Sequence, residues 1–251
     1  MATFPILHDV YDSIRFGRVL FAEIAPGPDP PTPCRYCSVL DGQPPPSRAH
    51  FSNPESCARA ILDPLGKGEA PERIVLGGPG DPLRELGIGS LLRRLRTAAH
   101  LGTVILTDGA LLHDRDARRD TDEAEMVVAW LPALTIPGGN GGGFPHGRRQ
   151  AIDRHIAGIA ALRRESRAQV AVEIEVRPGE NDNAESIAAW RRAVEVIRPH
   201  RTLIIPPGPD ATPEIIQSLE RVLEGVGSGA GVALVDPTPV DRRCYCDPPR
   251  R

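Results

Sequence analysis

Residues 19–37 read VLFAEIAPGPDPPTPCRYC, an apolar run of strand length and then a proline-rich loop that ends on two cysteines. The run Val19–Ile24 is continuous rather than alternating, as is typical of a parallel strand that is buried on both faces. Parallel α/β proteins place their active sites in the loops that follow such strands. The loop after Ile24 is therefore the first place in the chain to look for chemistry.

Five more apolar runs of strand length follow along the chain: Arg73–Leu76, Thr103–Thr107, Met126–Leu131, Gln169–Val176 and Thr202–Ile205. Helical patterns occupy residues 53–62, 88–98, 152–159, 183–197 and 215–223, with a weaker pattern over 111–124. Strands that alternate with crossover helices predict an α/β fold, a (β/α)6 sheet or partial barrel of parallel strands. A seventh apolar run, Val232–Val235, predicts an additional edge strand.

Length and charge limit the function classes. The 251 residues fit one core domain over residues 1–240, followed by a cysteine-containing tail over 241–251. A net charge of −3 and 4% aromatic residues do not indicate nucleic-acid binding. No apolar run is long enough to cross a bilayer, and residues 1–10 do not resemble a signal peptide, so we expect a cytoplasmic protein with no membrane association. Lys67 is the only lysine, which argues against Schiff-base chemistry.

Cys34 and Cys37 lie three positions apart in the loop after the first predicted strand. This spacing can present both sulfurs to one metal centre, and thiolates are ligands of zinc and of iron–sulfur clusters. The alternatives are two unconnected thiols or a redox pair. Five cysteines, at positions 34, 37, 57, 244 and 246, are too few and too unevenly spaced for a disulfide scaffold. We therefore expect metal ligation by the close pair.

A second candidate site is the turn Gly77-Gly78-Pro79-Gly80-Asp81-Pro82, which directly follows the second predicted strand. Glycines allow a ligand to approach the backbone closely, and the carboxylate of Asp81 can receive an ammonium group. The alternative is an ordinary turn, because Gly-Pro stretches are common between elements.

In their order and spacing, these two stretches resemble the radical S-adenosylmethionine (SAM) superfamily. More narrowly, the chain is similar to the short Fe–S oxidoreductases related to wyosine-forming and activating enzymes. That branch has Cys-x3-Cys-x2-Cys after the first strand, similar to residues 34–37, and Gly-x-Gly-Glu-Pro after the second, similar to residues 78–82. Residues 105–112, 144–146 and 176–182 resemble further segments of the branch, so the likeness spans about residues 10–205.

The resemblance implies an iron–sulfur oxidoreductase in which three thiolates, Cys34 and Cys37 among them, hold a [4Fe–4S] cluster. SAM would bind the fourth iron, and an electron donor such as ferredoxin or flavodoxin would reduce the cluster. Reductive cleavage of SAM would then produce a 5′-deoxyadenosyl radical that abstracts hydrogen from a substrate that the sequence does not identify. Cofactor chemistry of this kind leaves binding and orientation to the protein.

The resemblance also assigns binding roles to individual residues. Tyr36 would lie near the adenine of SAM, and Asp81 would receive the SAM ammonium group. Gly77, Gly78 and Gly80 would shape the methionine pocket.

The chain departs from the motif at Pro30, which stands where the family has its first cysteine and cannot ligate a metal. One sulfur from Cys57, Cys244 or Cys246 would have to replace that thiolate. Two other interpretations stay open. The protein is a degenerate, non-catalytic radical SAM-like subunit, or else two pairs of cysteines, residues 34 and 37 with 244 and 246, form a closed four-Cys site for zinc or an iron–sulfur cluster.

Overall fold

The computed structural model describes residues 4–13, 15–27, 47–66, 70–135, 146–206, 212–226 and 232–234. Four of the cysteines, Cys34, Cys37, Cys244 and Cys246, lie outside these residues, as does Tyr36. Within the described ranges, no helix is long and apolar enough to cross a membrane.

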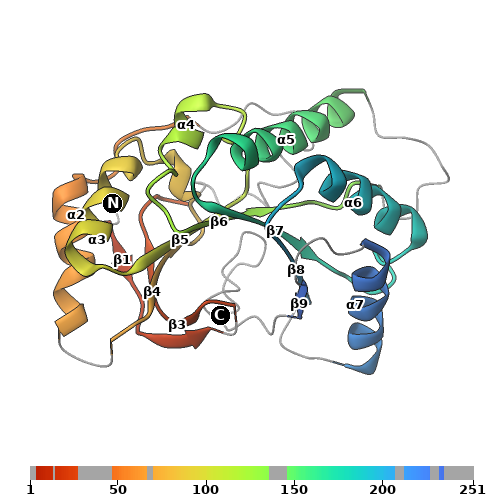
Figure 1. Ribbon diagram of the computed structural model, residues 1–251, viewed down its shortest axis with the longest axis horizontal. Helices are drawn as coiled ribbons and strands as arrows, with labels where there is room; N and C mark the ends of the chain where they lie inside the picture. Colours follow the sequence, from red (N-terminus) through yellow and green to blue (C-terminus); the bar gives the residue numbers. More distant parts are fainter. Residues whose placement is uncertain are drawn as a thin grey trace.

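One curved sheet organises the described part of the chain (Figure 1). Its parallel strands follow one another in chain order: β3 (Gly17–Glu23), β4 (Arg73–Gly77), β5 (Gly102–Thr107), β6 (Met126–Trp130), β7 (Gln169–Glu175), β8 (Arg201–Ile205) and β9 (Val232–Leu234). Two short strands, β1 (Ile6–Leu7) and β2 (Tyr11–Ser13), pair antiparallel with β3. Because the parallel strands never reverse their order, the topology is that of a barrel rather than of a doubly wound sheet.

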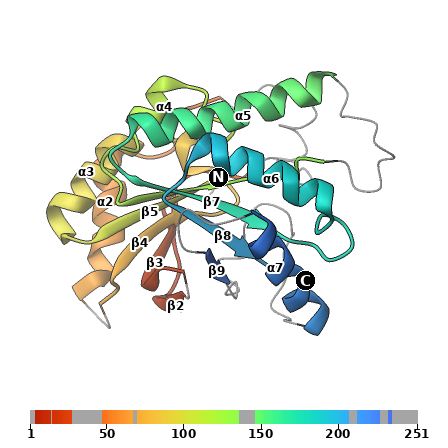
Figure 2. The ribbon, with the colours of Figure 1, turned by 45° about the vertical axis from the view of Figure 1, so that its right-hand side comes forward.

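Helices cover the convex face of this sheet (Figures 1 and 2). They are α2 (Pro54–Leu62), α3 (Ile88–Ala99), α4 (Arg115–Arg119), α5 (His146–Glu165), α6 (Ala184–Ile197) and α7 (Pro213–Val226), with 3₁₀ turns η1 (Asp63–Gly66) and η2 (Pro82–Arg84). The predicted (β/α)6 partial barrel is confirmed, and β9 is the additional strand that the seventh apolar run predicted.

The alternation of side chains along each strand divides the core into two layers. In β3 and just beyond it, Leu20, Ala22 and Ile24 belong to the large apolar cluster that the sheet forms with the helices. Val19 and Phe21 belong to a second cluster on the concave face. Burial on both faces explains why the strands appear in the sequence as continuous apolar runs.

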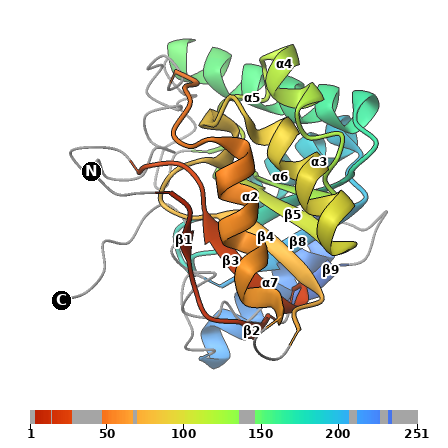
Figure 3. The same cartoon turned by 90° about the vertical axis from the view of Figure 1, so that its left-hand side faces the viewer.

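Local signals define α2, which lies beside α3 on the outside of the sheet (Figure 3). The side chain of Asn53 accepts hydrogen bonds from the backbone N–H groups of Glu55 and Ser56, at 2.9 and 3.2 Å. Pro54 occupies the first turn, where its missing N–H group costs nothing. The predicted start of this helix is therefore confirmed.

The segment 111–124 differs from its predicted helical pattern. Only Arg115–Arg119 forms a helix, α4, and turns flank it on both sides. Asp114 begins the helix by accepting a 2.9 Å hydrogen bond from the N–H group of Asp116. The hydroxyl of Thr121 donates to the carbonyl of Arg118 at 2.7 Å and satisfies the last turn. Side chains that bond locally to the backbone in this way favour caps and turns over a long helix.

Candidate functional site

The carboxyl ends of β3, β4 and β5 meet at one edge of the sheet. Glu23 is paired with Gly77, and Leu76 is paired with Ile105. The chain therefore leaves these three strands at neighbouring points, and the loops that follow them are adjacent. The predicted metal-binding segment continues from the first of these loops.

Gly77 and Gly78 allow β4 to end in close contact with β3. A Cβ atom at Gly77 would lie 2.9 Å from Cζ of Phe21 on the concave face. Gly78 has a φ of +110°, which strongly favours glycine, and a Cβ atom there would lie 2.6 Å from Cγ of Glu23. Packing alone thus accounts for both glycines. Their predicted part in a methionine pocket stays a prediction.

Gly80 brings the loop after β4 against the loop after β3. A Cβ atom at Gly80 would collide with the carbonyl oxygens of Ala25 and Pro26, which are backbone atoms and cannot rotate away. One residue further, a Cβ atom at Gly27 would lie 3.0 Å from Cβ of Pro79. These contacts fix the point at which the chain enters segment 28–46.

Asp81 joins the loops that follow β4 and β5. Its side chain is fully buried. Oδ1 accepts a 2.7 Å hydrogen bond from the N–H group of Leu83 and so caps η2. Oδ2 accepts hydrogen bonds from the hydroxyl of Thr107 at 2.7 Å and from the N–H group of Asp108 at 3.0 Å. The carboxyl group therefore fixes the relative position of two loops at the site.

The pKa of Asp81 is raised well above its ordinary value. Burial of the side chain is the main cause, and the neighbouring charge of Asp108 adds to it. Asp108 is itself buried, and its side chain accepts a 2.8 Å hydrogen bond from the N–H group of Ala110. The predicted contact between Asp81 and a ligand ammonium group stays a prediction.

The chain returns from segment 28–46 to the same place. Nε of Arg48 donates to the carbonyl of Leu83 at 2.9 Å. The N–H group of Ala49 donates to the carbonyl of Arg84 at 2.9 Å, and an isolated parallel bridge pairs Ala49 with Glu85. The predicted metal-binding segment thus begins and ends beside one short stretch, residues 79–86.

Two pairs of polar side chains lie on the concave face, and neither pair was predicted from the sequence. Nε2 of His8 lies 2.8 Å from Oε1 of Glu23, and the imidazole ring packs edge-on against Phe21 with 5.3 Å between ring centroids. Arg15 forms an ion pair with Glu173, and these two side chains are 2% and 5% exposed. The signal for both was an acidic residue inside an otherwise apolar strand.

His155 is a buried histidine of α5 and shows no sign of metal ligation. Its Nε2 atom lies 2.9 Å from the carbonyl oxygen of Trp130, and burial lowers its pKa, which favours the neutral ring. The ring packs against Gly109, where a Cβ atom would lie 2.6 Å from Cε1 of the histidine. His155 therefore supports the ends of β5 and β6.

Cys57 is poorly suited to replace the missing metal ligand. It is 1% exposed and belongs to the apolar cluster on the convex side of the sheet. Burial raises the pKa of its thiol to about 11, whereas a metal ligand must be a thiolate. The described residues include no group of three or more His, Cys, Asp or Glu side chains that could hold a metal ion.

The segment 176–182, which resembles a family motif, forms a turn after β7. Oδ1 of Asn181 accepts from the N–H group of Arg177 at 2.7 Å, and Nδ2 donates to the carbonyl of Glu175 at 3.0 Å. Asp182 accepts a 2.8 Å hydrogen bond from the N–H group of Gly179. Turn stabilisation accounts for these polar residues without a ligand. His146 belongs to another segment that resembles a family motif, and its side chain is not among those that the structure describes.

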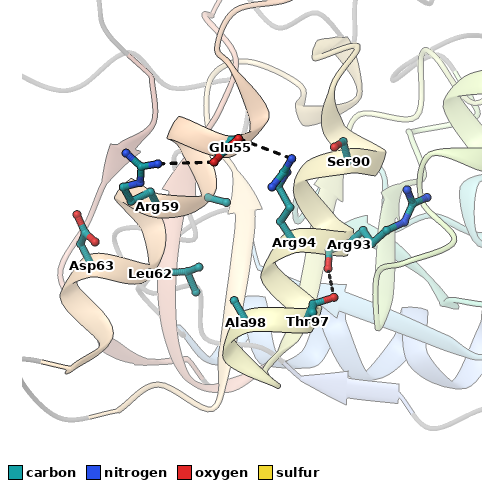
Figure 4. Close-up of a pocket in the computed structure, with 10 residues that line it drawn as sticks. Glu55, Arg59, Leu62, Asp63, Ser90, Arg93, Arg94, Thr97 and Ala98 are labelled. Atoms are coloured by element: carbon teal, nitrogen blue, oxygen red, sulfur yellow. Dashed lines mark hydrogen bonds and ion pairs between the residues drawn. The ribbon is translucent and has the colours of Figure 1, made fainter.

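A surface groove runs between α2 and α3 (Figure 4). Glu55 forms an ion pair across it with Arg94 of α3, at 3.9 Å, and a second one along α2 with Arg59, at 3.7 Å. Exposed pairs of this kind contribute little to stability. Of the residues predicted to bind a cofactor, Gly77, Gly78, Gly80 and Asp81 are among the described ones, and none of these four lines the groove.

Comparisons with known proteins support the fold. The sequence matches no model of a known protein family, and no protein of curated function is similar to it in sequence. Among solved structures, a radical SAM methyltransferase from Sphaerobacter thermophilus has a similar structure, with a TM-score of 0.61. The match covers 96% of this chain and 72% of that chain, at 17% sequence identity. This likeness establishes a radical SAM-like architecture, whereas a function must be argued from the site.

Proposed function

We propose that this protein is a radical SAM-type iron–sulfur enzyme that holds a [4Fe–4S] cluster through Cys34 and Cys37. One observation carries the proposal. The segment that contains both cysteines leaves β3 and returns beside the glycine-rich turn after β4, at the carboxyl edge of a radical SAM-like partial barrel. Active sites of parallel α/β proteins lie at this edge.

The donor set fits such a cluster when the C-terminal tail is included. Cys34 and Cys37 supply two thiolates, and Pro30 supplies none. Cys57 is buried on the convex side with a raised thiol pKa, and it is the one cysteine among the described residues. We therefore assign the third thiolate to Cys244 or Cys246. Sulfur ligands suit iron–sulfur clusters better than carboxylates do.

A cluster held by these cysteines would supply the electron for reductive cleavage of SAM, and a ferredoxin or flavodoxin would return that electron to the cluster. The residues of this chain bind and orient the reactants. Tyr36 would contact the adenine, and the turn over residues 77–81 would receive the methionine part, with Asp81 holding the loop after β5 in place. The His8–Glu23 pair lies on the concave side, at the carboxyl end of β3. The cytoplasmic location stays a prediction.

Anaerobic reconstitution with iron and sulfide tests the proposal. We expect the reduced wild-type protein to give the electron paramagnetic resonance (EPR) spectrum of a [4Fe–4S] cluster and SAM to alter it. Cys34→Ser and Cys37→Ser should remove the spectrum, while Cys57→Ser serves as the matched control and should retain it. Far-ultraviolet circular dichroism identifies any variant that has lost its fold.

The same experiment distinguishes the two other interpretations. Bound zinc, or a cluster whose spectrum is unchanged by SAM, would indicate the closed four-Cys site instead, because such a site leaves no open iron. Absence of any metal after reconstitution would indicate a non-catalytic relative.

A further inference from the structure

Arg84 contacts both ends of the segment that carries Cys34 and Cys37. It is the last residue of η2, and its Nη1 atom donates a 2.6 Å hydrogen bond to the carbonyl of Pro26, just before the segment. Its Cζ atom lies 5.1 Å from the ring centroid of Phe51, just after the segment. One guanidinium group therefore contacts the stretch that precedes segment 28–46 in the sequence and the stretch that follows it.

Glu85 fixes the returning end of the same segment. Its side chain is buried, at 1% exposure. Oε2 accepts hydrogen bonds from the N–H groups of Phe51 and Ser52, at 2.8 and 3.1 Å. Oε1 accepts from the N–H group of Gly87 at 2.8 Å and lies 3.2 Å from Nδ1 of His50. A buried carboxylate is costly unless it is hydrogen-bonded, and here backbone N–H groups satisfy both of its oxygens.

These contacts do more than complete the connection from β4 to α3. Within that connection, Asp81 caps η2 and α3 begins at Ile88. Neither the cap nor the start of the helix involves Pro26 or Phe51. The guanidinium of Arg84 and one carboxylate oxygen of Glu85 are instead directed at segments that come earlier in the chain. A loop whose two ends are already fixed loses less conformational entropy when it binds a ligand.

We propose that Arg84 and Glu85 are positioning residues that fix the two stretches flanking segment 28–46, at Pro26 and at residues 50–52, and thereby strengthen metal binding by Cys34 and Cys37. The inference rests on the proposed function for the identity of the bound group. The two end contacts themselves exist in the protein without any metal, so they can be tested separately.

Hydrogen exchange of the metal-free chain is the first measurement. The N–H groups of Phe51 and Ser52 should exchange at least tenfold faster in Arg84→Ala and in Glu85→Gln than in wild type. Arg96→Ala is the matched control, because Arg96 pairs with Glu123 at 2.7 Å on the exposed side of α3 and is 63% exposed. The control should exchange like wild type at these two amides.

Cobalt titration is the second measurement, because thiolate–Co²⁺ absorption reports binding by the cysteine sulfurs without any enzyme activity. We expect Arg84→Ala to bind Co²⁺ about tenfold more weakly than wild type, a change of about 1.4 kcal/mol. Arg84→Lys should recover part of the affinity, because lysine can still donate to Pro26 but lacks the planar group that stacks on Phe51. Melting temperatures should stay close to that of wild type.

The outcomes are distinguishable. Unchanged exchange at Phe51 and Ser52 in Arg84→Ala and Glu85→Gln would overturn the inference. Faster exchange with wild-type Co²⁺ affinity would also overturn it, because the contacts would then be structural only. Faster exchange in a protein whose wild type shows no thiolate–Co²⁺ absorption would uphold the fixing of the segment ends and refute the proposed function instead.

Discussion

Replacing Asp81 with alanine should strongly destabilise the protein. The fully buried carboxyl group accepts hydrogen bonds from the N–H groups of Leu83 and Asp108 and from the hydroxyl of Thr107, at 2.7 to 3.0 Å. The alanine variant leaves the two buried N–H groups without this acceptor, at a cost of about 1–3 kcal/mol each. We therefore expect the free energy of unfolding to fall by about 3 kcal/mol in weakly acidic solution.

The size of this loss should depend on pH in a defined direction. Burial, and after it the charge of Asp108, raises the pKa of Asp81 above its ordinary value of 3.8. The folded state therefore binds this proton more tightly than the unfolded state. The resulting stability is complete below pH 3.8 and is lost as pH rises through the folded pKa. The slope is at most about 1.4 kcal/mol per pH unit. The difference between wild type and Asp81→Ala should accordingly narrow as pH rises.

Urea unfolding followed by circular dichroism, from about pH 4 to about pH 8, measures this difference. Asp12→Ala is the control, because the Asp12 carboxylate is 81% exposed and pairs with Arg18 at 3.4 Å. The control should differ little from wild type at any pH. A difference for Asp81→Ala that widens with pH would refute the reasoning, since Asp81 would then be ionised and stabilised as an anion in the folded protein.

Three other expectations follow from the site. Cys57→Ser should leave the iron content of the reconstituted protein unchanged, because the thiol is buried in the apolar cluster between the sheet and the helices, and a loss of iron would place it among the ligands. Cys34→Ala and Cys37→Ala should each abolish iron and zinc binding with an unchanged circular dichroism spectrum; wild-type metal content in either variant contradicts this. Glu173→Ala removes the carboxylate that pairs with buried Arg15 and should lower the free energy of unfolding by about 3–5 kcal/mol in urea titrations. A loss below about 1 kcal/mol would show that this pair behaves like an exposed one.

The strands could be predicted because burial on both faces requires a continuous run of apolar residues. Most helices could be predicted from apolar residues at helical spacing. The run Val19–Ile24 is apolar because its side chains alternate between the helix-covered face and the concave core. β1, β2 and the segment 111–124 lacked such a signal in the sequence. β1 and β2 are two and three residues long, too short to show a period, and local hydrogen bonds to backbone divide the segment 111–124 into turns around α4.

The candidate site was predictable only where its residues are close in sequence. The turn over residues 77–81 was identified from its glycines, and the structure brings it against residues 25–27, which directly precede segment 28–46. The partners that come from distant elements were not identifiable. His8 lies 15 positions from Glu23, and Arg15 lies 158 positions from Glu173. The first pair depends on the antiparallel pairing of β1 with β3, and the second joins the chain just before β3 to β7; no local sequence pattern encodes either contact.

The topology also bears on which cysteine replaces the thiolate missing at Pro30. β9 pairs parallel with β8, so the chain leaves β9 at the same edge of the sheet at which it leaves β3. Cys244 follows Leu234 by ten residues, and an extended chain of that length spans up to about 33–36 Å. The large separation in sequence from Cys37 adds little cost, because closure entropy grows only with the logarithm of loop length. Folding of the sheet has already brought the end of β9, at Leu234, to the correct edge. Cys57 is near in sequence, but packed side chains and a raised thiol pKa oppose its ligation, so position and chemistry both favour the tail.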